Sequence, residues 1–437
     1  MTAREAAFLS LQKYRGSGKY SNIELSGSID RLGLEGAEKA LYTALFYGVI
    51  EREITLDYFI SRLSERRIDD IDRDVRTILE LGIYQLEYMD KIPESAAVNE
   101  SVKLARRFYA RKNSETFINA LLRSFIRERK NISFPKKEDN YIKYLSVCYS
   151  LPEWICSLWC DAYGKARAEK AAAGTLCRPT MTLRANTLKI SRDELIKRLD
   201  AAGIHSVPCK GAANGIRLTS HVPMDKLAEF DGLYFVQDEA SQIAVSALGA
   251  QPGDTVLDVC ACPGGKSFGT AMDMGNSGRI LAFDLHKNKL SLITRSAEKL
   301  GIEIIETAEN NASLYRDDMP EADGILCDVP CSGLGVIAKK PDIKYKNRED
   351  IERLPALQKA ILETSARYLK EGGTLVYSTC TLNPAENKNI VSAFLSENPA
   401  FELCPFRAGG AECEGMLELI PSETTDGFFI AKMKKGK

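Results

Sequence analysis

From Gln251 onward, short apolar runs alternate with amphipathic segments, and this alternation constrains the fold of the 437-residue chain more than any other feature. The apolar runs predict strands at 255–259, 279–283, 324–327 and 374–377. The segments between them predict helices, notably 287–300 and 350–369, the second of which is stopped by Gly372 and Gly373. Strands that alternate with helices predict an α/β domain with a parallel, doubly wound, Rossmann-like sheet.

The first third of the chain has a different pattern, because its apolar residues recur three and four positions apart, as in helices. Residues 1–134 therefore predict an all-α domain. Residues 138–245 predict linking helices and then a small α+β subdomain, with strands at 181–184 and 215–218 and a helix at 192–202. Residues 246–437 form the predicted catalytic domain.

Composition excludes several classes of protein. The net charge is −1 and 44% of residues are hydrophobic, which is typical of a soluble globular protein. The sequence has no apolar run long enough for a membrane span and no secretory pattern at Met1–Ser10. Its twelve cysteines are scattered, and its three histidines form no metal-ligand pattern. We therefore expect a cytoplasmic protein without a metal, a membrane contact or an obligatory protein partner.

One segment is strongly basic. Residues 102–137 contain eleven lysines or arginines and two acidic residues. Four of the cations share helical spacing: Lys103, Arg106, Arg107 and Arg111. They form either a solvated helix face or a surface that binds RNA phosphates and releases counterions. Lys339 and Lys340 are two further candidate phosphate contacts.

Residues with useful chemistry follow each predicted strand, where ligands bind to such sheets. Asp284 follows the second strand and stands 20 residues beyond Gly264, a position suited to gripping a ribose diol. The alternative is that Asp284 caps the following helix. The first strand leads into a glycine-rich loop that permits close approach of a ligand: Cys260, Ala261, Cys262, Pro263, Gly264, Gly265 and Lys266.

Two cysteines stand out from the others. Most cysteines in the chain are interpreted as small apolar core residues. Cys331 follows the third strand, just after Asp328, and Cys380 follows the fourth strand. A thiolate in such a turn is a suitable nucleophile for an electron-poor carbon. The residues alone do not say which of the two cysteines attacks.

These motifs resemble those of a known family, the RsmB (Sun) branch of the NOL/NOP2/Sun RNA cytosine-C5 methyltransferases. In the catalytic third, the matching segments are Asp258–Ser267, Asp328–Gly333, Lys340–Asp342, Tyr377–Asn387 and Thr425–Ala431. Arg184–Leu188 and Val236–Ser241 are similar to the segments that precede that domain. The N-terminal third resembles the NusB-type RNA-binding domain at Tyr47–Val49, Ile83–Leu86, Ala96–Glu100 and Phe117–Arg123.

The resemblance implies methylation of C5 of a cytosine in 16S rRNA, either naked or in an early assembly intermediate, with S-adenosylmethionine as cofactor. It implies that Cys380 attacks C6 and that Cys331 assists product release. Asp328 would contact both the cytosine edge and the cofactor.

The same resemblance implies cofactor contacts from the 260–266 loop and from Asp284. On the adenine side it implies a contact from Asn310, with Glu309 as a close alternative. Lys266 either binds the cofactor carboxylate or only caps the loop. Cys262 departs from the family, which usually has alanine there.

Two other functional classes remain open from the sequence. One is an RNA-binding or assembly factor with an inactive methyltransferase-like domain, but a scaffold would need neither cysteine. The other is a nucleotide-dependent dehydrogenase, which the absence of Gly-x-Gly-x-x-Gly disfavours.

Overall fold

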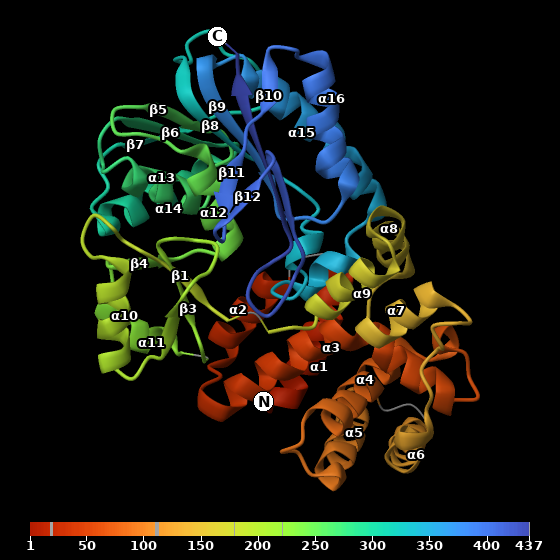
Figure 1. Cartoon of the computed structure of the whole chain (residues 1–437). Helices are drawn as coiled ribbons and strands as arrows, with labels where there is room; N and C mark the ends of the chain where they lie inside the picture. The colour runs from red at the N-terminus through yellow and green to blue at the C-terminus, as the bar shows by residue number, and fades with distance from the viewer. Residues whose placement is uncertain (18–20, 110–112, 179, 221, 437) are drawn as a thin grey trace. The chain divides into compact units, whose positions relative to one another are not determined.

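The computed structural model describes residues 1–17, 21–109, 113–178, 180–220 and 222–436 (Figure 1). The chain divides into two compact units. One unit contains residues 1–176 and 340–345, and the other contains residues 177–339 and 346–437. Within the described ranges, no helix combines the length and apolar character that a membrane crossing needs.

The first unit is helical, which confirms the predicted all-α fold of the N-terminal third. The long helix α3 (Gly36–Leu63) supplies much of its core, including Leu45, Phe46 and Val49. Gly48 lies on the same helix, and a Cβ there would meet the ring of Tyr84 at 2.0 Å. The other helices are α1 (Ala3–Ser17), α2 (Ser21–Leu32), α4 (Arg73–Tyr88), α5 (Glu94–Phe108), α6 (Ser114–Glu128), α7 (Tyr141–Tyr149), α8 (Glu153–Tyr163) and α9 (Lys165–Gly174).

Helices α7–α9 belong to this unit, although the sequence analysis interprets them as helices that link two domains. The short turn η5 (Pro341–Tyr345) also belongs to it. There Lys344 is buried and donates from Nζ to the carbonyl oxygens of Glu51 and Ser150, both at 2.6 Å. Burial lowers the pKa of Lys344 to about 7.

The second unit begins with the predicted α+β subdomain. Its four-stranded antiparallel sheet has the order β2-β3-β1-β4. The strands are β1 (Thr182–Ala185), β2 (Ser206–Pro208), β3 (Gly215–Leu218) and β4 (Tyr234–Val236), with helices α10 (Arg192–Ala201) and α11 (Met224–Leu227). Helix α12 (Glu239–Leu248) follows the subdomain and packs in the core of the larger sheet. Buried Arg184 on β1 pairs with Asp273 on α13 (Gly265–Asp273) at 2.6 Å. The subdomain is therefore fixed to the helix that follows the glycine-rich loop.

The rest of this unit is the predicted α/β fold. The main sheet has the order β10-β14-β9-β8-β5-β6-β7, and β13 pairs with β14. Its strands are β5 (Thr255–Asp258), β6 (Arg279–Asp284), β7 (Ile305–Glu309), β8 (Ala322–Asp328), β9 (Leu369–Thr379), β10 (Phe401–Leu403), β13 (Met416–Leu419) and β14 (Phe428–Lys435). Strands β5–β9 are parallel, whereas β10, β13 and β14 form an antiparallel edge. The sequence patterns predicted neither β7 nor this edge.

Alternate residues of the sheet serve two cores, one on each face. Val256 packs on the side of α13 and α14 (Lys287–Leu300), whereas its neighbour Leu257 packs on the opposite side. That opposite side carries α15 (Arg348–Ala366) and α16 (Lys388–Glu397). A small hairpin, β11 (Phe406–Ala408) with β12 (Ala411–Cys413), completes the unit. Because both faces are covered, the strands read as continuous apolar runs in the sequence.

The predicted end of the 350–369 helix is wrong. Helix α15 ends at Ala366, and β9 already begins at Leu369, so Gly372 and Gly373 lie inside a strand. The amide of Ala322 donates to the carbonyl of Tyr368 at 2.8 Å, which draws the chain into the sheet before the glycines.

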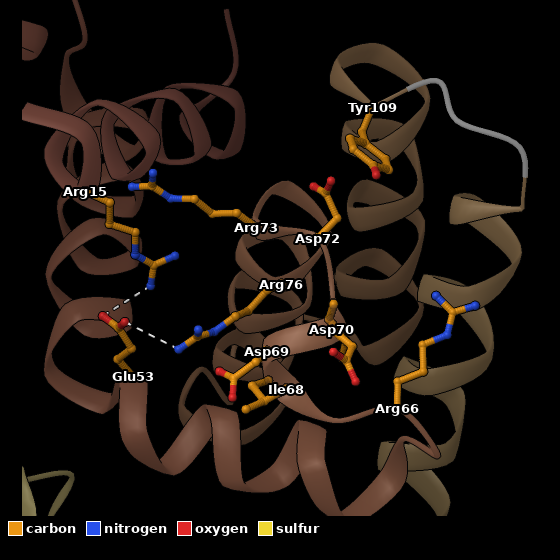
Figure 2. Close-up of a pocket in the computed structure, with 11 residues that line it drawn as sticks. Arg15, Glu53, Arg66, Ile68, Asp69, Asp70, Asp72, Arg73, Arg76 and Tyr109 are labelled. Atoms are coloured by element: carbon orange, nitrogen blue, oxygen red, sulfur yellow. Dashed lines mark ion pairs between the residues drawn. The ribbon is translucent and has the colours of Figure 1, made fainter.

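A cluster of charges is buried in the helical unit beside a hollow of about 800 Å³ (Figure 2). Glu53, Asp57 and Glu80 place their oxygens within 4.8 Å of one another, an arrangement that can hold a cation. Arg15 and Arg76 fill that role, since Arg15 pairs with Glu80 at 2.8 Å and Arg76 with Glu80 at 3.3 Å. Figure 2 shows both guanidinium groups directed at Glu53.

We predict that the Glu80→Gln substitution flattens the dependence of stability on pH. Burial raises the pKa of Glu80 above its ordinary 4.5, so its contribution to stability is full below that value and falls as the pH rises. The expected loss is at most about 1.4 kcal/mol per pH unit. Thermal melting of both proteins between pH 5 and pH 8 measures it.

Glu128→Gln is the matched control, because Glu128 is exposed on α6 of the same unit. It should leave the slope of melting temperature against pH unchanged. If melting temperature changes with pH equally in the wild type and in Glu80→Gln, then Glu80 does not retain a proton in the folded protein.

Candidate active site

The carboxyl ends of three neighbouring parallel strands meet at one edge of the sheet. Asp258 ends β5, Asp328 ends β8, and Thr379 ends β9, just before Cys380. Register brings them together, because Asp258 is opposite Leu326 and Asp328 is opposite Ser378. The strand pairing thus places carboxylates and thiols side by side, as the sequence predicted.

The glycine-rich loop after β5 borders a cavity of about 200 Å³. Gly264 has a φ of +105°, and a Cβ there would meet the Phe268 ring at 2.4 Å, so only glycine fits. Helix α13 starts at Gly265 and directs its free amide groups toward the loop. The cavity is lined by Val236, Gln237, Asp238, Ser241, Asp258, Cys260, Ala261, Cys262, Pro263, Gly265, Lys266 and Asp328.

Asp258 is a lining residue to which the sequence analysis assigned no role. Its Oδ2 accepts from Ser267 Oγ at 2.6 Å, while its buried Oδ1 has no hydrogen-bond partner in the described chain. Burial raises the pKa of Asp258 to about 6. An unpaired acceptor beside a cavity suits a ligand with an ammonium group. In the sequence, the position of Asp258 at the end of a strand is the feature that could have identified it as a site residue.

Asp284 ends β6 with one oxygen engaged and one available. Its Oδ1 accepts from the amide of His286 at 2.9 Å, which turns the chain into α14. That bond fits the alternative in which Asp284 shapes the helix start, but Oδ2 has no hydrogen-bond partner in the described ranges. Next to it, Asn310 is buried, and its backbone N–H donates to the backbone carbonyl of Asp284. Glu309, in contrast, is exposed. Asp284 and Asn310 therefore lie side by side at the ends of β6 and β7.

Asp328 is held by two donors. Lys266 Nζ lies 2.6 Å from Oδ2, and Ser378 Oγ donates to Oδ1 at 2.7 Å. Lys266 is mostly buried, which lowers its pKa, but Asp328 and, to a smaller extent, Asp258 and Cys380 raise the pKa above its ordinary value. The lysine therefore binds a carboxylate of this chain, which neither of its two predicted roles included.

The two predicted cysteines lie in contact. Their Sγ atoms are 3.2 Å apart, at the turns that follow β8 and β9. The hydrogen bond with Cys380 raises the pKa of Cys331 well above its usual value, and desolvation and nearby negative charges act in the same direction. Because the two sulfur atoms are in contact and a buried lysine lies nearby, the site favours a state in which one cysteine is a thiolate and the other remains a thiol.

The predicted RNA-binding cations of α5 are exposed, but acids pair with them. Lys103 pairs with Glu100 at 2.7 Å, Arg106 with Glu115 at 2.7 Å, and Arg107 with Glu5. Arg111 lies outside the described residues. Lys103 and Arg106 line a hollow of about 760 Å³ whose rim also carries Asn99 and Asn119. The face is thus polar and accessible, with less free positive charge than the sequence suggested.

Lys339 and Lys340, the two further candidate phosphate contacts, differ in their partners. Lys339 pairs with Asp426 at 2.6 Å and with Asp238 at 3.0 Å, so its ammonium group already has two carboxylate partners. Lys340 is exposed at the start of the segment that belongs to the helical unit. Of the two, only Lys340 presents its side chain to solvent without a carboxylate partner in the described structure.

Comparison with family models gives one description for each region. Residues 245–434 match the 16S rRNA methyltransferase RsmB/F model, and residues 1–127 match the NusB family. Residues 151–225 match the ferredoxin-like domain of RsmF/B-like methyltransferases. All three architectures agree with the fold predicted from the sequence.

Full-length relatives give the same assignment. A probable ribosomal RNA small subunit methyltransferase B from Bacillus subtilis is 37% identical and covers 99% of both chains. The corresponding Synechocystis protein is 35% identical over 100% of both. Among solved structures, a methyltransferase homolog protein from Pyrococcus horikoshii is 30% identical, with a TM-score of 0.60 over 68% of this chain and 99% of that one.

We predict that Asp284→Ala weakens binding of S-adenosylmethionine by about 1–3 kcal/mol, the scale for losing a charged hydrogen-bond partner. Titration calorimetry on the folded variant measures it. Glu298→Ala is the matched control, because Glu298 is an exposed acid near the far end of α14. Unchanged affinity in Asp284→Ala, with normal melting, would leave Asp284 only its role at the start of α14.

Proposed function

Because the chain belongs to the RsmB/F family of 16S rRNA methyltransferases, we propose that it methylates C5 of a cytosine in 16S rRNA, through a covalent bond between Cys380 and C6. S-adenosylmethionine supplies the methyl group. The observation that carries this proposal is the 3.2 Å contact of two thiols at the strand edge that also holds Asp328 and Lys266. Because its proposed substrate is ribosomal RNA, we infer that the protein acts in the cytoplasm.

C5 of cytosine is too poor a nucleophile to attack the methyl group by itself. The protein must therefore supply a nucleophile that adds to C6 and activates C5. When the Cys380 thiolate bonds to C6, the 5,6 double bond is lost and C5 gains the electron density that methylation requires. After methyl transfer, C5 loses its proton and the bond from C6 to Cys380 breaks, which restores the double bond and the thiolate. The positive charge of Lys266, which interacts with Cys380, favours the thiolate at the first and last steps.

Asp328 is oriented to recognise the base. Ser378 and Lys266 each occupy one of its oxygens, and each oxygen keeps a second lone pair for the substrate. A carboxylate accepts well from the N4 amino group of cytosine, and from N3 when that atom gains a proton.

The cofactor is assigned to the cavity at the glycine-rich loop. The unpaired Oδ1 of Asp258 suits the ammonium group of S-adenosylmethionine, and the available oxygen of Asp284 suits the ribose. Gly264 and Gly265 allow the backbone to approach it closely. In this role Lys266 serves Asp328, and the loop binds the cofactor through its backbone.

The target base must leave its stack to reach Cys380, at a cost of a few kcal/mol. Favourable contacts between cations and RNA phosphates offset that cost, and they do so without reading the base sequence. The α5 face with Lys103, Arg106 and Arg107, together with Arg111 and Lys340, is our candidate for those contacts. Lys103 and Arg106 are exposed and their carboxylate partners are half-buried, and surface pairs of this kind are worth at most about 1 kcal/mol, so phosphates can replace the carboxylates.

The two cysteines test the mechanism. Cys380→Ala should form neither product nor a covalent bond with RNA. Cys331→Ala should attack and methylate but release slowly, so that an adduct dependent on S-adenosylmethionine accumulates on denaturing gels. The double variant should show no adduct. The reverse pattern would exchange the two roles, and retained activity in both variants would exclude covalent catalysis here.

The basic face is tested separately. Replacing Arg106, Arg107 and Arg111 together by alanine should weaken RNA binding and reduce its salt dependence, by up to about three charges' worth of slope. The control replaces three exposed arginines that also pair with acids, Arg198, Arg316 and Arg348. Equal salt slopes for the two triple variants would show that the α5 face is only solvated.

A further inference from the structure

Glu386 is a buried acid that the catalytic scheme does not use. It ends the turn η6 (Pro384–Glu386), and solvent reaches none of its side chain. Four hydrogen bonds reach its carboxylate, and every donor is neutral: Ser332 N at 2.8 Å, Ser332 Oγ at 2.5 Å, Asn383 Nδ2 at 2.9 Å and Gln358 Nε2 at 3.0 Å. A buried charge that contacts no cation is expensive, so its position needs a reason.

The hydrogen bonds of Glu386 join the two cysteine turns. Ser332 follows Cys331, and its hydroxyl lies 2.7 Å from that of Thr381, which follows Cys380. Because Ser332 donates to Glu386, Thr381 must donate in that pair. Gln358 also donates to the carbonyl of Pro330, on the other side of Cys331, at 2.9 Å. Glu386 thus fixes the turn of Cys331 from both sides and links it to the turn of Cys380.

The next residue, Asn387, completes the same network around Cys380. Its Nδ2 donates to the carbonyl of Thr381 at 2.9 Å, and its Oδ1 accepts from Thr379 Oγ1 at 2.5 Å. Tyr377 donates to the backbone carbonyl of Glu386 at 2.6 Å. The distance between the two thiols is therefore set by one set of buried contacts centred on Glu386 and Asn387.

The charge of Glu386 also acts on the thiols unequally. It raises the pKa of Cys331, after the larger effects of the Cys380 contact and of desolvation, and Asp328 adds to it. Lys266 is on the other side, where it interacts with Cys380. Lys346 donates to the carbonyl of Ser332 at 2.9 Å, so this cation contacts the Cys331 turn through its backbone. The negative charge thus opposes ionisation of one cysteine, and the lysine favours ionisation of the other.

We propose that Glu386 is a positioning residue that clamps the Cys331 turn against the Cys380 turn and keeps Cys331 protonated while Cys380 reacts. The thiol that assists release is then available as a neutral group beside the nucleophile. The assignment of the two cysteine roles rests on the proposed function, whereas the effect of Glu386 on Cys331 does not.

The test is a thiol titration in the full-length Cys380→Ala protein, without RNA or cofactor. Alkylation of Cys331 by iodoacetamide is followed against pH by peptide mass spectrometry. With Glu386 intact, the pH of half-reaction should lie above the ordinary value of about 8.5. Adding Glu386→Gln should lower it by about one unit or more, as expected for removal of a nearby like charge.

Asn383→Ala is the matched control, because it removes one donor from the same carboxylate and keeps the charge. It should leave the pH of half-reaction unchanged. An equal decrease in Asn383→Ala, or no decrease in Glu386→Gln, would mean that Glu386 only supports packing. If Glu386→Gln does not fold, an ordinary value near 8.5 in the Cys380→Ala protein alone would overturn the proposal.

A second measurement uses the protein with both cysteines. In Glu386→Gln, the alkaline limb of the methylation profile should move to lower pH by the same amount as the alkylation value, and Glu386→Asp should restore it. A limb that does not move would overturn the link to catalysis. If the wild-type protein methylates no cytosine, the proposed function fails, while the titration still decides the role of Glu386.

Discussion

Parallel pairing of β8 with β5 on one side and with β9 on the other determines where the reactive side chains of this protein lie. A slip of one residue would turn Asp328 away from Ser378 and Lys266, since neighbouring residues of a strand face opposite sides of the sheet. The register is held by apolar residues on both faces, such as Val256 on one and Leu257 on the other. Burial on both faces leaves the carboxyl ends of the strands as the natural place for polar groups.

The three carboxylates near that edge have different kinds of partner. Asp328 has a cation, Asp258 is buried with one oxygen unpaired, and Glu386 is surrounded by neutral donors. In a region of low dielectric these differences matter more than in water. Lys266 interacts with both Asp328 and Cys380, so its loss would affect two groups at once.

The sequence predicted those parts of the site that depend on local order. Apolar runs gave the strands β5, β6, β8 and β9, and hence the positions of Asp284, Asp328, Cys331 and Cys380 at their ends. It did not predict contacts between distant residues. Glu386 lies 54 residues from Ser332, and Lys266 lies 62 from Asp328, so no local pattern shows that they meet. The end of α15 was misjudged for the same reason, since pairing with Ala322 outweighed the local preference of the glycines.

The basic segment is a second case in which contacts between distant residues could not be predicted from local sequence. Counting residues 102–137 gives a strong positive excess, but Arg107 pairs with Glu5, which is 102 positions away. Binding a phosphate at Arg106 or Arg107 exchanges one anion for another, so the carboxylate must return to water or find a new cation. The favourable free energy then comes mainly from counterions released by the RNA. A face of this kind suits RNA that is held by several weak contacts at once, with the chemistry selected at the strand edge of the other unit.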